Sequence, residues 1–338
     1  MHSLKSFRKN SFIIIVVTLI VLYFVLRDQF TEVVHALSTV NIGWILLAIL
    51  FFLLSIFVRS YVNYKSINNK KKITLMEAFK HNTIIQFFNG ITPFSIGGQP
   101  MELYMIRSHN IKTTEATNIV IQNFIFYQFA LVILGAVAVL YNFIFRIFPE
   151  VTLLRNLVLI GFIFNALVAV MLIVVAVSKR FTRKCMHIVL AIGSKIKVIK
   201  DKEKMEDKLT LKLKEFHDSA KELNKRKKLL VFGVLLNIVS LICLYIVPLF
   251  VLYSLGEFND VSVLGAITAS AYIMVMGSFV PLPGGAGGVE FGYLQFFGSF
   301  IAGPILTTSL LIWRVITYYL GMIIGGIAFN FDKKGEMK

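Results

Sequence analysis

Two short segments combine proline, glycine and glutamate inside otherwise apolar sequence, and these residue types are able to form a binding site. The first break (residues 91–102) contains Pro93, Gly97, Gly98, Gln99, Pro100 and Glu102, and the second break (residues 281–290) contains Pro283, Gly284, Gly285, Gly287, Gly288 and Glu290. Backbone that leaves the helical conformation at bilayer depth is tolerated only inside protein or beside a wet cavity. One such break in each half of a chain indicates the substrate site of a transporter built from repeats.

Each break is expected to end one helix and start another. Asn89-Gly90 is a helix stop, Pro100 suits the first position of a new helix, and the second break should restart near Val289. The free N–H groups and positive dipole end of a starting helix bind anions. We therefore expect a lipid phosphate to bind at the breaks. The alternative is that the glycines only permit close helix packing.

Two charged residues, Glu290 and Arg314, lie in apolar sequence. A charge at bilayer depth costs at least about 2.5–3.5 kcal/mol on insertion scales and needs a partner or water. We expect a Glu290–Arg314 pair, acting as a structural clamp or as part of a substrate pathway. Glu102 is expected to face Arg107 or water, and Arg59 to be the snorkelling cytoplasmic end of a span.

Two polar stripes lie near the first break. Asn118 and Gln122 are one helical turn apart, and Asn82, Gln86 and Asn89 also repeat at helical spacing. Either stripe could line a groove for headgroups or form interhelical hydrogen bonds. The sequence contains no ATP-binding loop and no catalytic or metal-binding motif. We therefore expect no catalytic residue, no metal site and no cofactor.

The elements that position these residues are those of a polytopic membrane protein, because 57% of the 338 residues are hydrophobic and only 16% are charged. We expect an all-α fold and a single integral membrane domain over residues 1–338. Six full spans are predicted at 11–29, 42–59, 115–141, 156–177, 229–253 and 305–330. The first would be an uncleaved signal anchor. Segments 75–111 and 261–302 are predicted to be re-entrant hairpins, each containing one break.

The net charge of +17 would suit a nucleic-acid partner, but the positions of the charges argue against one. With the N-terminus inside, 30 of the 35 lysines and arginines fall on the cytoplasmic side, as the positive-inside rule requires. Both termini are then cytoplasmic. The two hairpins open from opposite sides, which is an inverted-topology arrangement.

A basic cytoplasmic insert is expected at residues 179–228. Its apolar residues recur every three or four positions, as on one face of a helix: Met205, Leu209, Leu213, Phe216, Ala220 and Leu223. This pattern predicts either an amphipathic helix bound to anionic lipid headgroups or a solvated helix packed on the bundle.

The two break motifs, Thr92 to Pro100 and Pro283 to Glu290, resemble the lysylphosphatidylglycerol synthase transmembrane-region family over roughly residues 10–332. The resemblance implies a flippase-like fold in the bacterial cytoplasmic (inner) membrane. In the family's multiple peptide resistance factor, the membrane half moves aminoacylated phosphatidylglycerol outward and a soluble half makes it. We expect no synthase half here. Gln99 stands where the family often has glutamate, so the resistance factor's headgroup preference is not carried over.

These observations predict translocation, by flipping or scrambling, of a phospholipid or glycolipid. One alternative is a non-transporting membrane partner that recruits a cytoplasmic lipid-modifying enzyme through residues 179–228. Another is an intramembrane lipid-phosphate enzyme with Glu102, Glu290 and Arg314 as acid, base and phosphate clamp. The cargo, its energy coupling and the oligomeric state are not specified by the sequence.

Overall fold

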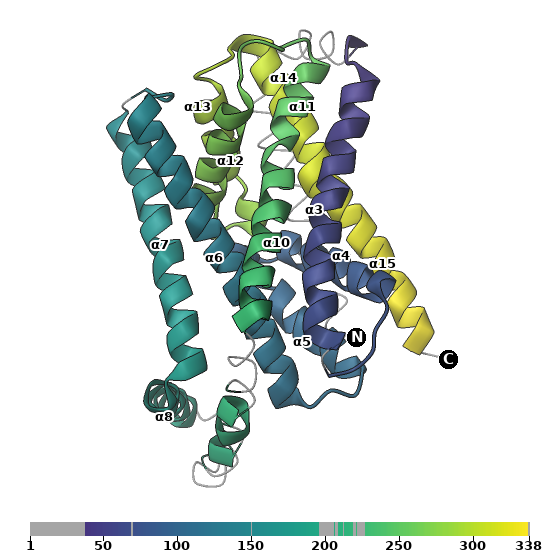
Figure 1. Cartoon of the computed structure of the whole chain (residues 1–338), viewed down its shortest axis with the longest axis vertical. Coiled ribbons are helices and arrows are strands. Elements are labelled where there is room, and N and C mark those ends of the chain that lie inside the picture. Colours follow the sequence, from purple (N-terminus) through teal and green to yellow (C-terminus); the bar gives the residue numbers. More distant parts are fainter. Residues whose placement is uncertain are drawn as a thin grey trace.

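The computed structural model describes residues 38–68, 70–149, 151–195, 206, 209–211, 213–218, 221 and 227–336. Within these residues the chain is all-helical, and the long helices run side by side as one bundle (Figure 1). The helices of the first half are α3 (Ile42–Asn68), α4 (Leu75–Ile91), α5 (Gly98–Ser108), α6 (Thr113–Phe145), α7 (Thr152–Val177) and α8 (Lys179–Lys195). Those of the second half are α10 (Lys227–Tyr245), α11 (Val247–Ser254), α12 (Val263–Gly277), α13 (Gly288–Phe297), α14 (Gly303–Arg314) and α15 (Gly321–Glu336).

Five helical stretches in the described part of the chain are long and apolar enough to cross a bilayer. They are Ile42–Asn68, Thr113–Phe145, Thr152–Val177, Lys227–Ser254 and Gly303–Asn330. Each of these five stretches contains one predicted span. The sixth predicted span, at 11–29, lies outside the described residues. Large apolar side chains of α7 such as Ile163, Leu167 and Val170 are exposed, as expected for a surface that faces lipid. The chain is a multi-pass, all-helical membrane protein.

The two halves of the bundle pack in the same way. α4 packs against α5 and α12 packs against α13. A long helix follows each pair: α6 follows α4 and α5, and the continuous stretch from α14 to α15 follows α12 and α13. Each long helix packs against the other half, since α6 contacts α12 and α15 contacts α4. α3 packs against α10 and α11. In Figure 1, α12 and α13 occupy the upper part of the bundle and α5 the lower part.

The lower end of the bundle in Figure 1 carries α8, which is seen nearly end-on and therefore runs across the bundle axis. α15 also ends at this end of the molecule. The basic insert predicted from the sequence and the last helix thus share one end of the bundle.

Candidate functional site

The first break is caused by Pro93, because the residue before a proline is driven out of the helical conformation. Thr92 is extended (φ −114°, ψ 145°) and ends α4. The side chains of Thr92 and of Asn89 in α4 then accept hydrogen bonds from the backbone at the start of the next helix. Gly97 N–H donates to Thr92 Oγ1 at 2.8 Å, and Gly98 N–H donates to Asn89 Oδ1 at 2.8 Å. The predicted stop at Gly90 is wrong by one residue, since α4 continues to Ile91.

The second break begins with the same backbone turn as the first. Phe94 and Gly284 follow the two prolines with φ, ψ of 54°, 12° and 60°, 17°. Both turns are closed by the same hydrogen bond. Ile96 N–H donates to Pro93 O at 3.4 Å, and Ala286 N–H donates to Pro283 O at 3.2 Å. The left-handed conformation suits glycine but strains phenylalanine. Two segments that share little sequence therefore adopt one local structure.

The two breaks lie against each other, at the turns Pro93–Ser95 and Pro283–Gly285. Tyr318 joins them: its hydroxyl donates to Gly90 O at 2.9 Å, and its ring lies so close to Gly284 that a Cβ there would overlap it. Tyr318 belongs to a π-helical segment, Val315–Leu320. Such segments are rare and often mark functional sites.

The predicted Glu290–Arg314 pair is present. Arg314 Nε donates to Glu290 Oε1 at 2.7 Å, and its Nη2 forms a second bond to the same oxygen. Glu290 Oε2 accepts from Gly287 N–H at 2.7 Å, which caps the start of α13. The pair is mostly removed from solvent, with side-chain exposures of 11% for Arg314 and 15% for Glu290. The arginine also lies over the Tyr318 ring, 5.1 Å from its centre.

Two adjoining cavities open beside the breaks. The inner cavity, of about 250 Å³, is lined by α3, α4, α10 and the segment around Arg314, and the outer cavity, of about 460 Å³, extends to α7. They share seven lining residues: Arg59, Asn89, Ser95, Tyr127, Met274, Gly284 and Val289. Both mix polar groups with apolar surface, which suits an amphipathic ligand.

Arg59 is the residue that the sequence interpretation placed wrongly. α3 does not end there but continues to Asn68, and the Arg59 side chain lines both cavities. Its guanidinium lies 4.8 Å from the centre of the Tyr127 ring. No described carboxylate lies within salt-bridge distance of it. Arg59 is thus a half-buried cation that faces a cavity and forms no ion pair with a described acid.

Glu102 does not face Arg107, which is exposed. It is 8% exposed, and its Oε1 accepts from Asn123 Nδ2 at 2.9 Å. It lines a third, small cavity of about 10 Å³ together with Arg59, close to the space that one water needs.

The helix start after the first break differs from the expected anion site. The N–H groups of Gly97 and Gly98 are already bonded to Thr92 and Asn89, and Pro100, which is the third residue of α5 rather than the first, has none. At the start of α13, by contrast, no described residue accepts from the N–H groups of its first three residues, 288–290.

The remaining predicted pathway residues divide into two groups. Gln99, Gly284, Gly285 and Arg314 line the inner or the outer cavity. Those that shape the breaks without lining these two cavities are Pro93, Gly97, Gly98, Pro100, Pro283, Gly287 and Gly288.

The two predicted polar stripes have different surroundings. Asn82, Gln86 and Asn89 all line the inner cavity, and they also form interhelical hydrogen bonds, such as Asn82 Nδ2 to Ser60 Oγ at 3.1 Å. Neither Asn118 nor Gln122 lines the inner or the outer cavity. Asn118 Nδ2 instead donates to Phe216 O at 2.9 Å.

That bond ties the basic insert to the bundle. Phe216 and His217 are buried, and Thr182 Oγ1 lies 3.3 Å from His217 Nε2. Phe216 of the predicted stripe is therefore buried within the protein. The other stripe residues with described side chains are Leu209, which is half-buried, and Leu213.

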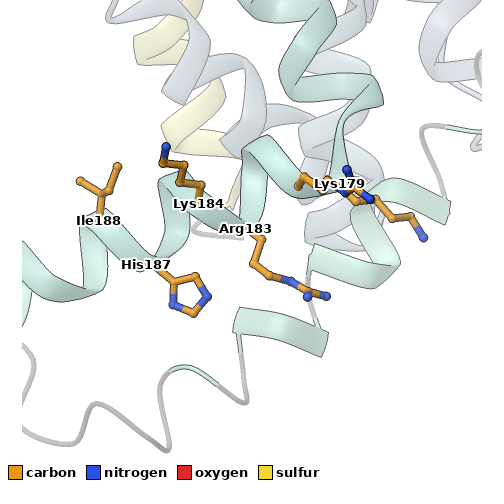
Figure 2. Close-up of a pocket in the computed structure, with 6 residues that line it drawn as sticks. Lys179, Arg183, Lys184, His187 and Ile188 are labelled. Atoms are coloured by element: carbon orange, nitrogen blue, oxygen red, sulfur yellow. The ribbon is translucent and has the colours of Figure 1, made fainter.

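α8 presents a basic surface (Figure 2). Lys179, Arg180, Arg183, Lys184, His187 and Ile188 surround a depression on this helix. Figure 2 shows Lys184 and Ile188 on one side of α8, and Arg183 and His187 on the other.

Besides Arg59, two site residues were missed by sequence reasoning: Tyr127 and Tyr318. Both are aromatic residues in apolar spans, where tyrosine is unremarkable. For Arg59 a signal exists, since the polar residues after it, at 60, 63 and 66, repeat every three positions and predict that α3 continues with one polar face.

The chain matches the family model described as "Lysylphosphatidylglycerol synthase TM region" over residues 11–325. A search of curated proteins returned no match. The match covers both breaks, Arg59 and the Glu290–Arg314 pair, and it confirms the resemblance carried by the two motifs. The chain belongs to the family of lysylphosphatidylglycerol synthase transmembrane regions.

Proposed function

We propose that this protein translocates an anionic phospholipid or glycolipid across the bacterial cytoplasmic membrane. The observation that carries the proposal is Arg59, a cation without an ion-pair partner among the described residues, in the wall of both cavities. A half-buried charge at bilayer depth requires a counter-charge or water. A lipid phosphate supplies the counter-charge, and an arginine binds it with two parallel N–H donors.

The rest of the phosphate site is supplied by the second break. Arg314 lines the inner cavity, held in place by Glu290. At the start of α13, the open N–H group of Val289, which lines both cavities, adds a donor and the positive end of the helix dipole. The amides of Asn82, Gln86 and Asn89 face the same space and bind the headgroup. The acyl chains remain in lipid beside the outer cavity, whose wall includes Phe94, Phe164 and Val168.

The packing of the two halves supports the finer topology. In this proposal the chain has six spans, and the α4–α5 and α12–α13 pairs are re-entrant hairpins that enter from opposite sides and meet at the breaks. The matching turns at Phe94 and Gly284 support such an inverted repeat. A site where the two hairpins meet can be opened to either side by movement of one hairpin. Flipping and scrambling both use this arrangement.

The basic helix α8 supports the proposed orientation. An amphipathic helix that runs across the bundle axis is suited to the membrane surface, and each lysine or arginine near an anionic surface adds about 1 kcal/mol. We place α8 on the cytoplasmic leaflet, against anionic headgroups, with both chain termini on the same side.

The test is reconstitution of the purified protein into liposomes that contain a fluorescent phosphatidylglycerol. Dithionite bleaches the dye in the outer leaflet, so translocation appears as loss of the protected fraction. Arg59→Gln should lower the rate about 10- to 100-fold, because a hydrogen bond to a charged group contributes about 1.5–3 kcal/mol. Arg59→Lys should recover part of it, since it keeps the charge without the planar donors.

Arg107→Gln is the matched control, because Arg107 is an exposed arginine outside the cavities. It should translocate like the unmodified protein. Lipid movement no faster than in protein-free liposomes would refute the proposal. Co-purification of a cytoplasmic lipid-modifying enzyme would then favour a recruiting role, and product formed from lipid phosphate would favour an enzyme.

A further inference from the structure

The buried carboxylate of Glu102 is not used by the proposed phosphate site. Its one described hydrogen bond comes from Asn123, whose own Oδ1 accepts from Ser66 Oγ at 2.8 Å. The side chain is 8% exposed and faces the small cavity that it shares with Arg59. A carboxylate in such a place needs either a close cation or a proton.

Glu290, the corresponding acid of the other break, has a cation as its partner. Each glutamate lies in the first two turns of the helix after its break, and each contacts the helix that follows. Glu290 is bonded to Arg314, whereas Glu102 has the neutral amide of Asn123 in the same role. No described cation lies within salt-bridge distance of Glu102.

An orphan acceptor lies beside Glu102. Gln99 precedes it by three residues, on the same face of α5, and lines the same small cavity. Gln99 Oε1 is buried and has no donor among the described residues. A carboxylate accepts only, but a protonated carboxyl group also donates one hydrogen bond. A proton on Glu102 would give the pair a donor that the charged form lacks.

The charges around Glu102 are few. Besides Arg59, the polar residues that line the small cavity are amides: Asn63, Asn89, Gln99, Asn123 and Asn237. On α5, Tyr104 and Arg107 are exposed, and His81 and His109 lie with their Nε2 atoms 3.4 Å apart. Arg59 is therefore the main charge that acts on Glu102, and it is also the proposed phosphate ligand.

Resting on the proposed function, we infer that Glu102 is a proton-binding site and that one proton moves with each anionic lipid. When the phosphate binds Arg59, the positive field at Glu102 is cancelled and a like charge is brought near, so the carboxyl group gains affinity for a proton. The proton is taken from water on one side and forms an O–H bond on Glu102. It returns to water on the other side when the lipid leaves, which restores the carboxylate.

This coupling makes a directional prediction. The proton and the lipid travel in the same direction, so an acidic lumen drives fluorescent phosphatidylglycerol out of the inner leaflet. A gradient of about one pH unit should shift the final distribution up to about tenfold, since about 1.4 kcal/mol is a factor of ten. The combined charge of lipid and proton is zero, so an imposed potential should have little effect.

The experiment uses the same proteoliposomes with pyranine in the lumen to report its pH. Glu102→Gln should still exchange lipid but ignore the gradient, while Glu102→Asp should keep the response. Glu115→Gln, which changes an acid paired with Lys70 at 3.2 Å on the surface, is the control. The inference is overturned when the unmodified protein exchanges lipid without responding to the gradient, or when Glu102→Gln responds as strongly.

A second readout separates this inference from the proposed function. Infrared difference spectra should show a carboxylic-acid C=O band that titrates with pH, increases with phosphatidylglycerol vesicles and is absent in Glu102→Gln. If the protein moves no lipid, the proposed function fails, and this band alone decides whether Glu102 binds a proton. Its absence from the unmodified protein overturns the proton site in either case.

Discussion

Gly284→Ala is the substitution that we expect to disrupt the contact between the two breaks most strongly. The Gly284 backbone is left-handed (φ 60°, ψ 17°), and a Cβ there would overlap the Tyr318 ring. The same ring is held by a hydrogen bond from its hydroxyl to Gly90 O at 2.9 Å. Gly284→Ala therefore strains one break and pushes away the residue that ties it to the other.

The expected cost has two parts. A non-glycine residue in the left-handed conformation costs about 1–2 kcal/mol. Displacing the ring breaks its hydrogen bond, which contributes about 1 kcal/mol. The stability of the Gly284→Ala protein should therefore fall by about 2–3 kcal/mol, measured by denaturant unfolding in detergent micelles, and lipid translocation should slow with it.

Gly303→Ala provides the control, because Gly303 also has a positive φ (68°) but no atom within 4 Å of a Cβ. It should cost only the backbone strain. In a Tyr318→Ala background, Gly284→Ala should cost no more than Gly303→Ala, since the overlapping ring is gone. Equal losses for the two alanine variants in the unmodified background would show that Tyr318 yields freely, and the argument for a rigid link would be wrong.

Three further predictions concern other parts of the fold. Glu290→Gln should destabilise the protein by about 1.5–3 kcal/mol, because it leaves Arg314 without its charged partner. In the same unfolding assay, the double variant Glu290→Gln with Arg314→Gln should lose less stability than the two single variants lose together. Phe94→Gly should raise stability by about 0.5–1 kcal/mol, because it relieves left-handed strain of about 1–2 kcal/mol and loses part of this gain to unfolded-chain entropy; a lower unfolding midpoint would contradict this. The Thr74 backbone N–H, as the largest cause, lowers the pKa of Glu77 below its usual value of 4.5. Stability should therefore be lost as the pH falls from 4.5 through that lowered pKa. Glu77→Gln, which removes the titrating group, should flatten this pH dependence of the melting temperature.

The helix breaks could be predicted because they arise from local chemistry. Pro93 and Pro283 each force the preceding residue into an extended conformation, whatever surrounds them. The predicted pair of Glu290 and Arg314 is nearly local as well, since a charge at bilayer depth has few partners within reach. These features needed no knowledge of how the helices pack.

The end of α3 could not be predicted from hydropathy, and this hid Arg59. The apolar run weakens after Arg59, but the helix continues because its polar residues find partners on neighbouring helices. Asn63 Nδ2 donates to Asn82 Oδ1 at 3.2 Å, and Ser66 Oγ donates to Asn123 Oδ1 at 2.8 Å. Polar groups bonded in this way are compatible with a helix inside the bundle.

The sequence alone determined the membrane class, the family, the position of both breaks and the distribution of positive charge, because hydropathy, backbone preference and charge are properties of individual residues and short windows. Only the tertiary structure decided which groups meet. It placed Tyr318 against Gly90, 228 residues away in the chain, and left Arg59 facing a cavity while Arg314 received an acid. Such partners depend on how distant helices pack, and no short window of sequence contains that information.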